Sequence, residues 1–198
     1  MELPASKEYY TYADYLAWDE SERYEIIDGK LYAMATPTRE HQGISMEISG
    51  QIWLFLKDKP CKVYVAPFGV RLFEKDDDTP DDVGTVLEPD ISVVCDSNKL
   101  DKKGCKGAPD FVIEILSPSN ERHDVFVKYN LYMRAGVREY WIVDPERKNV
   151  MVYLLDENGV YKLSEMYGEN DAAKITVLND CPIDLKAVFA NSEPRNDD

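Results

Sequence analysis

The sequence predicts an α/β (α+β) fold in which helices flank a mixed central sheet, with a helix and a hairpin ahead of it. Short apolar runs typical of strands alternate with runs of helical periodicity, and no linker divides the 198 residues. The runs at 90–95 and 110–116 are apolar on both faces, as in strands that are buried on both sides. We therefore expect a single domain over residues 1–190, followed by a loosely ordered polar tail at 191–198.

Three elements are predicted in the first third of the chain. Residues 11–18 are expected to form a short helix that begins after a threonine cap. Residues 24–37 are expected to form a hairpin, because Asp28 and Gly29 separate two alternating segments. Apolar residues recur at three- and four-residue steps over residues 40–56, at Ile44, Ile48, Ile52 and Phe55, which predicts a second helix.

The rest of the chain predicts further strands around one more long helix. The expected elements are a strand at 61–73 bent near Pro67 and Gly69, an acidic loop at 74–88, a strand at 90–95, a lysine-containing loop at 96–109, a strand at 110–116, a helix at 124–135, a strand at 139–143, a hairpin at 150–163 and a short helix at 185–189. Gly136 follows the long helix at the position where a glycine commonly ends one.

The charge balance limits the classes of partner. The chain has 23 basic and 38 acidic residues, so its formal charge is −15. This excess favours solubility and opposes loose adhesion to nucleic acids or anionic membranes, which need cationic surface. No apolar run approaches the roughly 20 residues of a membrane helix. The N-terminal residues do not resemble a signal peptide either, so we expect a cytoplasmic protein with no membrane partner.

The cysteines and histidines limit the metal chemistry. The four cysteines (Cys61, Cys95, Cys105 and Cys181) form no CxxC pair, and we expect reduced thiols rather than a disulfide framework or a zinc site. Only two histidines occur in the chain. A metal site would therefore depend on oxygen ligands, which favours Mg²⁺ or Mn²⁺.

Two acidic residues interrupt apolar strands. Glu114 lies in the run 110–116 on the same face as Val112 and Leu116, where a carboxylate is costly unless a positive group meets it. Asp90 opens the strand that follows Pro89. If the two strands are neighbours, a divalent cation between the carboxylates would remove their repulsion. The alternatives are a structural salt bridge for Glu114 and a strand cap for Asp90.

Lys128 is the third candidate. It lies on or beside an apolar stripe of the predicted helix 124–135, which directly follows the Glu114 strand and should pack back onto the sheet. An ammonium group there could stabilise a phosphate in its transition state. Alternatively, the side chain extends past the apolar surface into solvent.

Three segments carry a family resemblance. They are EPDISVV at 88–94, PDFVIEILSPSN at 109–120 and KYNLYMRAGVREYWIVDP at 128–145. With the hairpin YEIIDGKLYAM, they resemble the Uma-type restriction endonuclease family over residues 12–155. The resemblance implies a PD-(D/E)XK nuclease fold with a restriction-endonuclease-like core. It also implies that Asp90 and Glu114 hold the metal, and that the lysine usually found two residues after the second acid has moved to Lys128.

The resemblance adds further candidates for the same site. Glu25 in the hairpin and His41 at the start of the second helix match recurrent positions of the family pattern, and Glu47 on that helix is a weaker candidate. The ordinary alternatives are a cross-strand pair for Glu25, a polar residue at a helix start for His41, and a solvated helix face for Glu47.

These observations predict a metal-dependent endonuclease that hydrolyses DNA phosphodiester bonds. The acidic charge motivates an alternative, in which a nuclease-derived fold is kept for binding or oligomerisation without catalysis. A local basic rim formed by the lysines of residues 99–106 with Arg134 and Arg138 would reconcile the charge with a DNA substrate. A homodimer or higher homo-oligomer is also expected, because the 140–163 region is rich in aromatic residues and valine.

Overall fold

The computed structural model describes residues 7–18, 23–117 and 123–190. The polar tail predicted at 191–198 lies outside the described residues. Four α-helices occur in the described ranges: α1 (Tyr12–Ala17), α2 (Arg39–Leu56), α3 (His123–Ala135) and α4 (Leu185–Ala190). None of them is long and apolar enough to cross a membrane.

The central sheet has six strands in the order β12-β11-β10-β9-β6-β3. Its strands are β3 (Lys62–Val65), β6 (Ile91–Val94), β9 (Phe111–Ile115), β10 (Glu139–Asp144), β11 (Asn149–Leu155) and β12 (Tyr161–Gly168). The pair β9–β10 is parallel and the other pairs are antiparallel, so the sheet is mixed. The predicted fold class is therefore confirmed.

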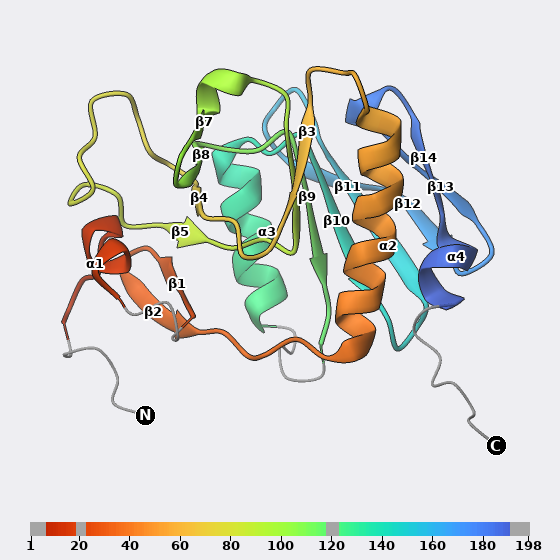
Figure 1. The fold of residues 1–198 in the computed structure, drawn as a ribbon, viewed down its shortest axis with the longest axis horizontal. Helices are drawn as coiled ribbons and strands as arrows, with labels where there is room; N and C mark the ends of the chain where they lie inside the picture. Colours follow the sequence, from red (N-terminus) through yellow and green to blue (C-terminus); the bar gives the residue numbers. More distant parts are fainter. Residues whose placement is uncertain (1–6, 19–22, 118–122, 191–198) are drawn as a thin grey trace.

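Helices cover both faces of this sheet (Figure 1). Ile113 of β9 packs in one core cluster with Ile48 of α2 and Phe189 of α4. Val112, the preceding residue of the same strand, packs in a second cluster with Leu131 of α3. Because side chains alternate along a strand, β9 is apolar on both faces, as expected from its sequence.

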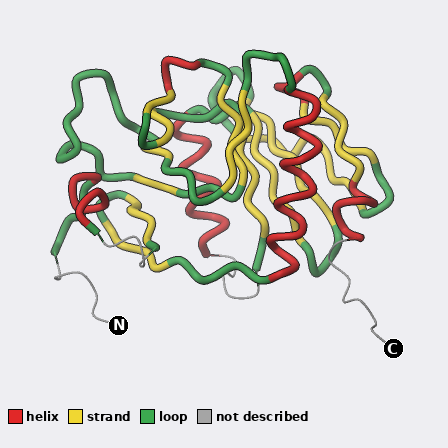
Figure 2. The backbone as a smooth tube through the Cα atoms, viewed as in Figure 1, coloured by secondary structure: helices red, strands yellow, loops and turns green. Residues whose placement is uncertain are grey.

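A second six-stranded sheet contains the N-terminal hairpin, in the order β2-β1-β5-β4-β8-β7. Its strands are β1 (Tyr24–Ile27), β2 (Lys30–Ala33), β4 (Val70–Arg71), β5 (Val86–Leu87), β7 (Leu100–Asp101) and β8 (Gly104–Lys106). Figure 2 shows these short strands beside the long strands of the central sheet. Asp28 and Gly29 both have positive φ, 47° and 76°, as the predicted tight hairpin turn requires.

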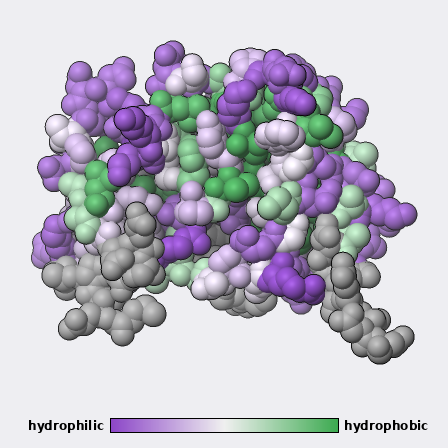
Figure 3. Space-filling view, in the orientation of Figure 1, coloured by the Kyte–Doolittle hydropathy of each residue, from purple (hydrophilic) through white to green (hydrophobic). Residues whose placement is uncertain are grey.

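The prediction of one continuous, bent strand at 61–73 is wrong. The chain leaves the central sheet after β3 and enters the second sheet as β4, so residues 66–69 connect two sheets instead of bending one strand. Pro67 has no backbone N–H to donate to a ladder, and Tyr64 and Phe68 stack with ring centroids 4.2 Å apart across this connection. The acidic segment at 74–88 is a loop up to β5, and the corner of the molecule that it occupies is strongly hydrophilic (Figure 3).

Two further predictions need correction. The segment 96–109 contains the β7–β8 hairpin, and the two-stranded sheet of β13 (Ala172–Ile175) and β14 (Cys181–Asp184) was not predicted. The prediction of four reduced thiols is wrong for Cys61 and Cys95, which form a disulfide. These residues adjoin paired ends of β3 and β6, where Lys62 is opposite Val94, so the antiparallel register brings the two thiols together. Cys105 and Cys181 are free and buried.

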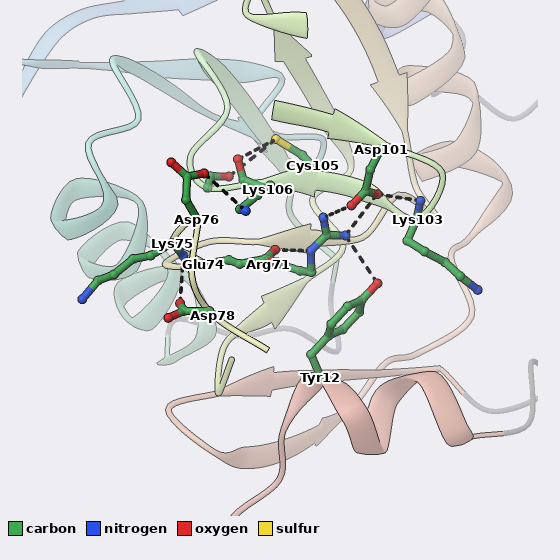
Figure 4. A network of polar contacts seen from close by, with 11 residues as sticks. Tyr12, Arg71, Glu74, Lys75, Asp76, Asp78, Asp101, Lys103, Cys105 and Lys106 are labelled. Carbon is green, nitrogen blue, oxygen red and sulfur yellow. Dashed lines mark hydrogen bonds and ion pairs between the residues drawn. The ribbon is translucent and has the colours of Figure 1, made fainter. Parts of the chain in front are cut away.

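Arg71 of β4 holds the second sheet together (Figure 4). Its side chain is 1% exposed and forms ion pairs with Glu74 and Asp101. It also donates a hydrogen bond of 3.4 Å to the hydroxyl of Tyr12 on α1. A buried guanidinium is stable only when its donors meet acceptors, so this cluster fixes β4, β7 and α1 relative to one another.

We expect Arg71→Met to lower the free energy of unfolding by about 3 kcal/mol, because it leaves Glu74 largely buried without its cation. The matched control is Arg134→Met, since Arg134 and Asp28 are 57% and 59% exposed in their pair. An exposed pair contributes about 1 kcal/mol or less. Urea unfolding monitored by tryptophan fluorescence measures both variants, and equal losses would contradict a structural role specific to Arg71.

Candidate functional site

A cavity of about 160 Å³ lies where the N-terminal hairpin, the start of α2, the strands β6 and β9, and α3 come together. Five residues that the sequence singled out line it: Glu25, His41, Asp90, Glu114 and Lys128. Residues more than 100 positions apart in sequence, such as Glu25 and Lys128, thus line the same cavity.

The register of the central sheet places the two predicted metal ligands side by side. Strands β6 and β9 are antiparallel neighbours, with Ile91 opposite Ile113. Asp90 comes just before Ile91 and Glu114 just after Ile113, so the two acids leave the paired strands at the same end. The condition that their strands are neighbours is met, although the short β7–β8 hairpin lies between them in the chain. Asp90 Oδ2 also accepts a hydrogen bond of 2.8 Å from the backbone N–H of Ile115.

Glu114 is 9% exposed and lies on the α3 side of the sheet. Its Oε1 accepts a hydrogen bond of 2.6 Å from the hydroxyl of Tyr132 and lies 3.1 Å from Nζ of Lys128. Burial raises the pKa of Glu114 to about 7, against the lowering effect of Lys128 and with a further increase from Asp90 and Glu25. The carboxyl group therefore gives up its proton less readily than an exposed glutamate does.

Lys128 bridges two carboxylates. Its Nζ lies 2.9 Å from Oε1 of Glu25 and 3.1 Å from Oε1 of Glu114, and its side chain is 12% exposed. Burial lowers the pKa of Lys128, but Glu114 and Glu25 more than offset this effect, so the pKa is raised and the ammonium group stays charged. The alternative in which Lys128 extends into solvent is wrong.

Glu25 and His41 each contact a member of this group. Glu25 is on β1, 5% exposed, and its Oε1 also accepts a hydrogen bond of 3.0 Å from the backbone N–H of Glu88. Nε2 of His41 lies 3.1 Å from Oδ2 of Asp90, and the backbone N–H of His41 is capped by the Thr38 hydroxyl at the start of α2. Burial lowers the pKa of His41, but the contact with Asp90 outweighs burial, so the pKa is raised.

Three further residues of the site were not predicted. Arg23 and Glu88 line the cavity and form an ion pair of 2.6 Å, and Tyr132 binds Glu114 as described above. Tyr132 is four residues after Lys128, so helical spacing alone could have indicated that both approach one carboxylate. Glu88 also accepts a hydrogen bond of 2.7 Å from the hydroxyl of Tyr15, a contact that depends on tertiary structure and has no local sequence signal.

Other candidates lie elsewhere. Glu47 is half-buried on α2, accepts a hydrogen bond from Gln51, and does not line the cavity. No lysine of residues 99–106 lines the cavity, and neither does Arg134 or Arg138, so the suggested basic rim does not form part of the cavity wall.

The donor set suits Mg²⁺ or Mn²⁺ bound mainly through water and substrate. Both described hydrogen bonds to Asp90 go to Oδ2, and both polar contacts of Glu114 go to Oε1, so each carboxylate keeps a second oxygen for another ligand. The described cavity lining carries four carboxylates and two fixed cations, an excess of two negative charges that a divalent ion would balance. Within the described ranges, no three His, Cys, Asp or Glu side chains are grouped to hold a metal. Mg²⁺ is commonly bound through only one or two carboxylates together with waters and substrate phosphates.

The fold is that of a nuclease-like protein. It superposes on the crystal structure of a "putative nuclease belonging to DUF820" from Anabaena variabilis with a TM-score of 0.72, covering 93% of this chain and 99% of that chain at 20% sequence identity. Residues 12–185 match the Uma2 family, which is described as "Putative restriction endonuclease". The chain therefore belongs to the Uma2 family, as the sequence motifs predict.

Two curated relatives come from Synechocystis sp. Uncharacterized protein slr1290 is 27% identical over 149 residues, which are 74% of each chain. Uncharacterized protein sll1609 is 23% identical over 175 residues, which are 86% of this chain and 94% of that protein. The similarity thus extends over most of all three chains.

The raised pKa of Glu114 predicts a pH-dependent stability. Because the folded state binds this proton more tightly than the unfolded state, stability is lost as the pH rises from about 4.5 to about 7. We expect Glu114→Gln to remove up to about 3 kcal/mol of this loss. Urea unfolding at pH 5 and pH 8 measures the difference.

Glu139 provides a matched control, since burial also raises its pKa to about 7 and it lies away from the cavity. In Glu114→Gln the pH dependence due to Glu139 should remain. If the free energy of unfolding of Glu114→Gln falls as much between pH 5 and pH 8 as that of the unmodified protein, the pKa of Glu114 is not raised by folding.

Proposed function

We propose that this protein is a metal-dependent endonuclease that hydrolyses phosphodiester bonds of DNA in the cavity. The observation that carries the proposal is the meeting of Asp90 and Glu114 beside the charged ammonium group of Lys128, where each carboxylate has one oxygen that the described polar contacts leave free. Membership of the Uma2 family supports the same reaction. A bound Mg²⁺ or Mn²⁺, held by Asp90 and Glu114, would supply positive charge for the scissile phosphate and help to ionise the attacking water.

The residues of the chain have separate tasks in this proposal. Lys128 is charged and desolvated, so its electrostatic effect on a phosphate oxygen is stronger than that of an exposed lysine. Glu25 holds the ammonium group from the side opposite the central sheet. His41 holds Oδ2 of Asp90, which fixes the carboxylate while Oδ1 stays available.

A non-catalytic binding role is the second candidate. The net charge of −15 favours it, because a polyanionic substrate is repelled. Calorimetric titration with Mn²⁺ separates the two candidates. Binding that Asp90→Ala abolishes supports the nuclease, whereas no heat at millimolar Mn²⁺ supports the non-catalytic role.

Loss of Lys128 should lower the rate of cleavage much more than it affects metal binding. We expect Lys128→Gln to lower kcat about 10²–10³-fold, the range seen when one charge-stabilising donor is removed, while Mn²⁺ binding is retained. Circular dichroism and urea unfolding check that this variant is folded. The assay is cleavage of labelled DNA with Mg²⁺ or Mn²⁺. Lys62→Gln is the control, because Lys62 is exposed on the edge strand β3 and does not line the cavity. Undiminished cleavage by Lys128→Gln would contradict the assigned role.

Asp90→Asn tests the metal ligand itself. The amide is a weaker ligand for a hard cation, so cleavage and Mn²⁺ binding should both be lost. Circular dichroism and urea unfolding check that the variant is folded. Cleavage at the original rate by folded Asp90→Asn would exclude Asp90 from the proposed site.

A further inference from the structure

Both fixed cations at the cavity are already bound to carboxylates of the protein. Arg23 pairs with Glu88 at 2.6 Å, and Lys128 pairs with Glu25 and Glu114. No other lysine or arginine lines the cavity within the described ranges. A phosphate that enters therefore meets few cations that are not already engaged.

Lys102 and Lys103 are exposed in the turn between β7 and β8, but three of the other basic residues expected to bind DNA outside the cavity are paired with carboxylates. Their pairs are Lys106–Asp76 at 3.4 Å, Arg138–Asp110 at 2.6 Å and Arg134–Asp28 at 3.7 Å. Proteins that hold a duplex neutralise several phosphates along it, and counterion release from these contacts supplies most of the affinity. The overall charge of the chain repels a long, densely charged helix.

The cavity lining instead offers apolar and aromatic surface. One wall contains Ile27, Tyr32, Met34 and Pro37, and Val127 of α3 lies beside Lys128. Tyr32 is half-buried on β2 directly opposite Glu25, so its ring is held next to the acidic group. Base-to-aromatic stacking is the usual way in which proteins bind unpaired nucleotides without reading their sequence.

The depth of the acidic groups favours a flexible substrate. Glu25 and Glu114 are only 5% and 9% exposed, so the scissile phosphate must come close to groups below the surface. Double-stranded DNA is stiff over about 150 base pairs and bends at an energetic cost. A single strand can bend one phosphate into the cavity while a neighbouring base stacks on the rim.

We infer that the substrate is single-stranded nucleic acid, bound through stacking of a base on Tyr32 and not through a cationic surface. This inference rests on the proposed function of the cavity, and it specifies the class of substrate. Since few phosphates are neutralised, binding should depend weakly on salt compared with binding by a basic nuclease.

The first experiment measures binding separately from cleavage. Fluorescence anisotropy compares a labelled 20-nucleotide single strand with the duplex of the same sequence, with Ca²⁺ as the divalent ion and gel analysis to confirm intact DNA. We expect the single strand to bind at least tenfold more tightly. Equal or tighter binding of the duplex, or no binding of either DNA, would overturn the inference.

The second experiment tests Tyr32. We expect Tyr32→Ala to weaken single-strand binding about tenfold, as for loss of one stacked base. It should raise KM and leave kcat within about threefold, which a general loss of structure would not do. Trp53→Ala is the matched control, because Trp53 is 60% exposed on α2 and does not line the cavity. Equal effects of the two substitutions would count against the inference.

Cleavage of the same two DNAs distinguishes the two proposals. A protein that prefers the single strand in binding but cuts neither DNA retains the inferred substrate class and loses the hydrolytic function. Conversely, a protein that cuts the duplex as fast as the single strand is a nuclease, and the inference is then wrong.

Discussion

The ion triad of Lys128 with Glu25 and Glu114 is the constraint on which the arrangement of this cavity depends. It joins three elements that are separate in the chain, since Glu25 is on β1 of the second sheet, Glu114 on β9 of the central sheet and Lys128 on α3. Two carboxylates this deeply buried would repel each other and lose hydration, and the cation between them offsets both costs. The N-terminal hairpin therefore contributes to the site, because without Glu25 the ammonium group would face one carboxylate.

The triad also explains why the cavity carries more negative than positive charge. Lys128 balances one of two carboxylates, and Arg23 balances Glu88, so two negative charges remain when Asp90 and Glu114 are ionised. Burial is the main cause of the raised pKa of Glu114, and the neighbouring carboxylates of Asp90 and Glu25 raise it further. A divalent cation would remove the same excess without a proton, and an acidic protein could then hold a phosphate locally.

The sequence predicts best those features that local chemistry determines. The Asp28-Gly29 turn, the helix that Gly136 ends and the acids in apolar strands at positions 90 and 114 each carry a signal within a few residues. Strands of two residues, such as β4, β5 and β7, have no measurable periodicity and form through their partners. The Cys61–Cys95 disulfide likewise depends on the β3–β6 register, which composition and spacing do not reveal.

Helix α3 links stability to the proposed chemistry through one carboxylate. Tyr132 and Lys128 lie one turn apart, and both bind Oε1 of Glu114. The hydrogen bond and the ion pair satisfy the buried charge on one oxygen, so the other oxygen can bind a metal ion without loss of either contact. A lysine two residues after Glu114 would share its face of β9, because side chains alternate, but it would approach along the strand. From the helix, Lys128 instead approaches across the cavity and can contact Glu25 on the second sheet as well, which a residue of β9 itself is poorly placed to do.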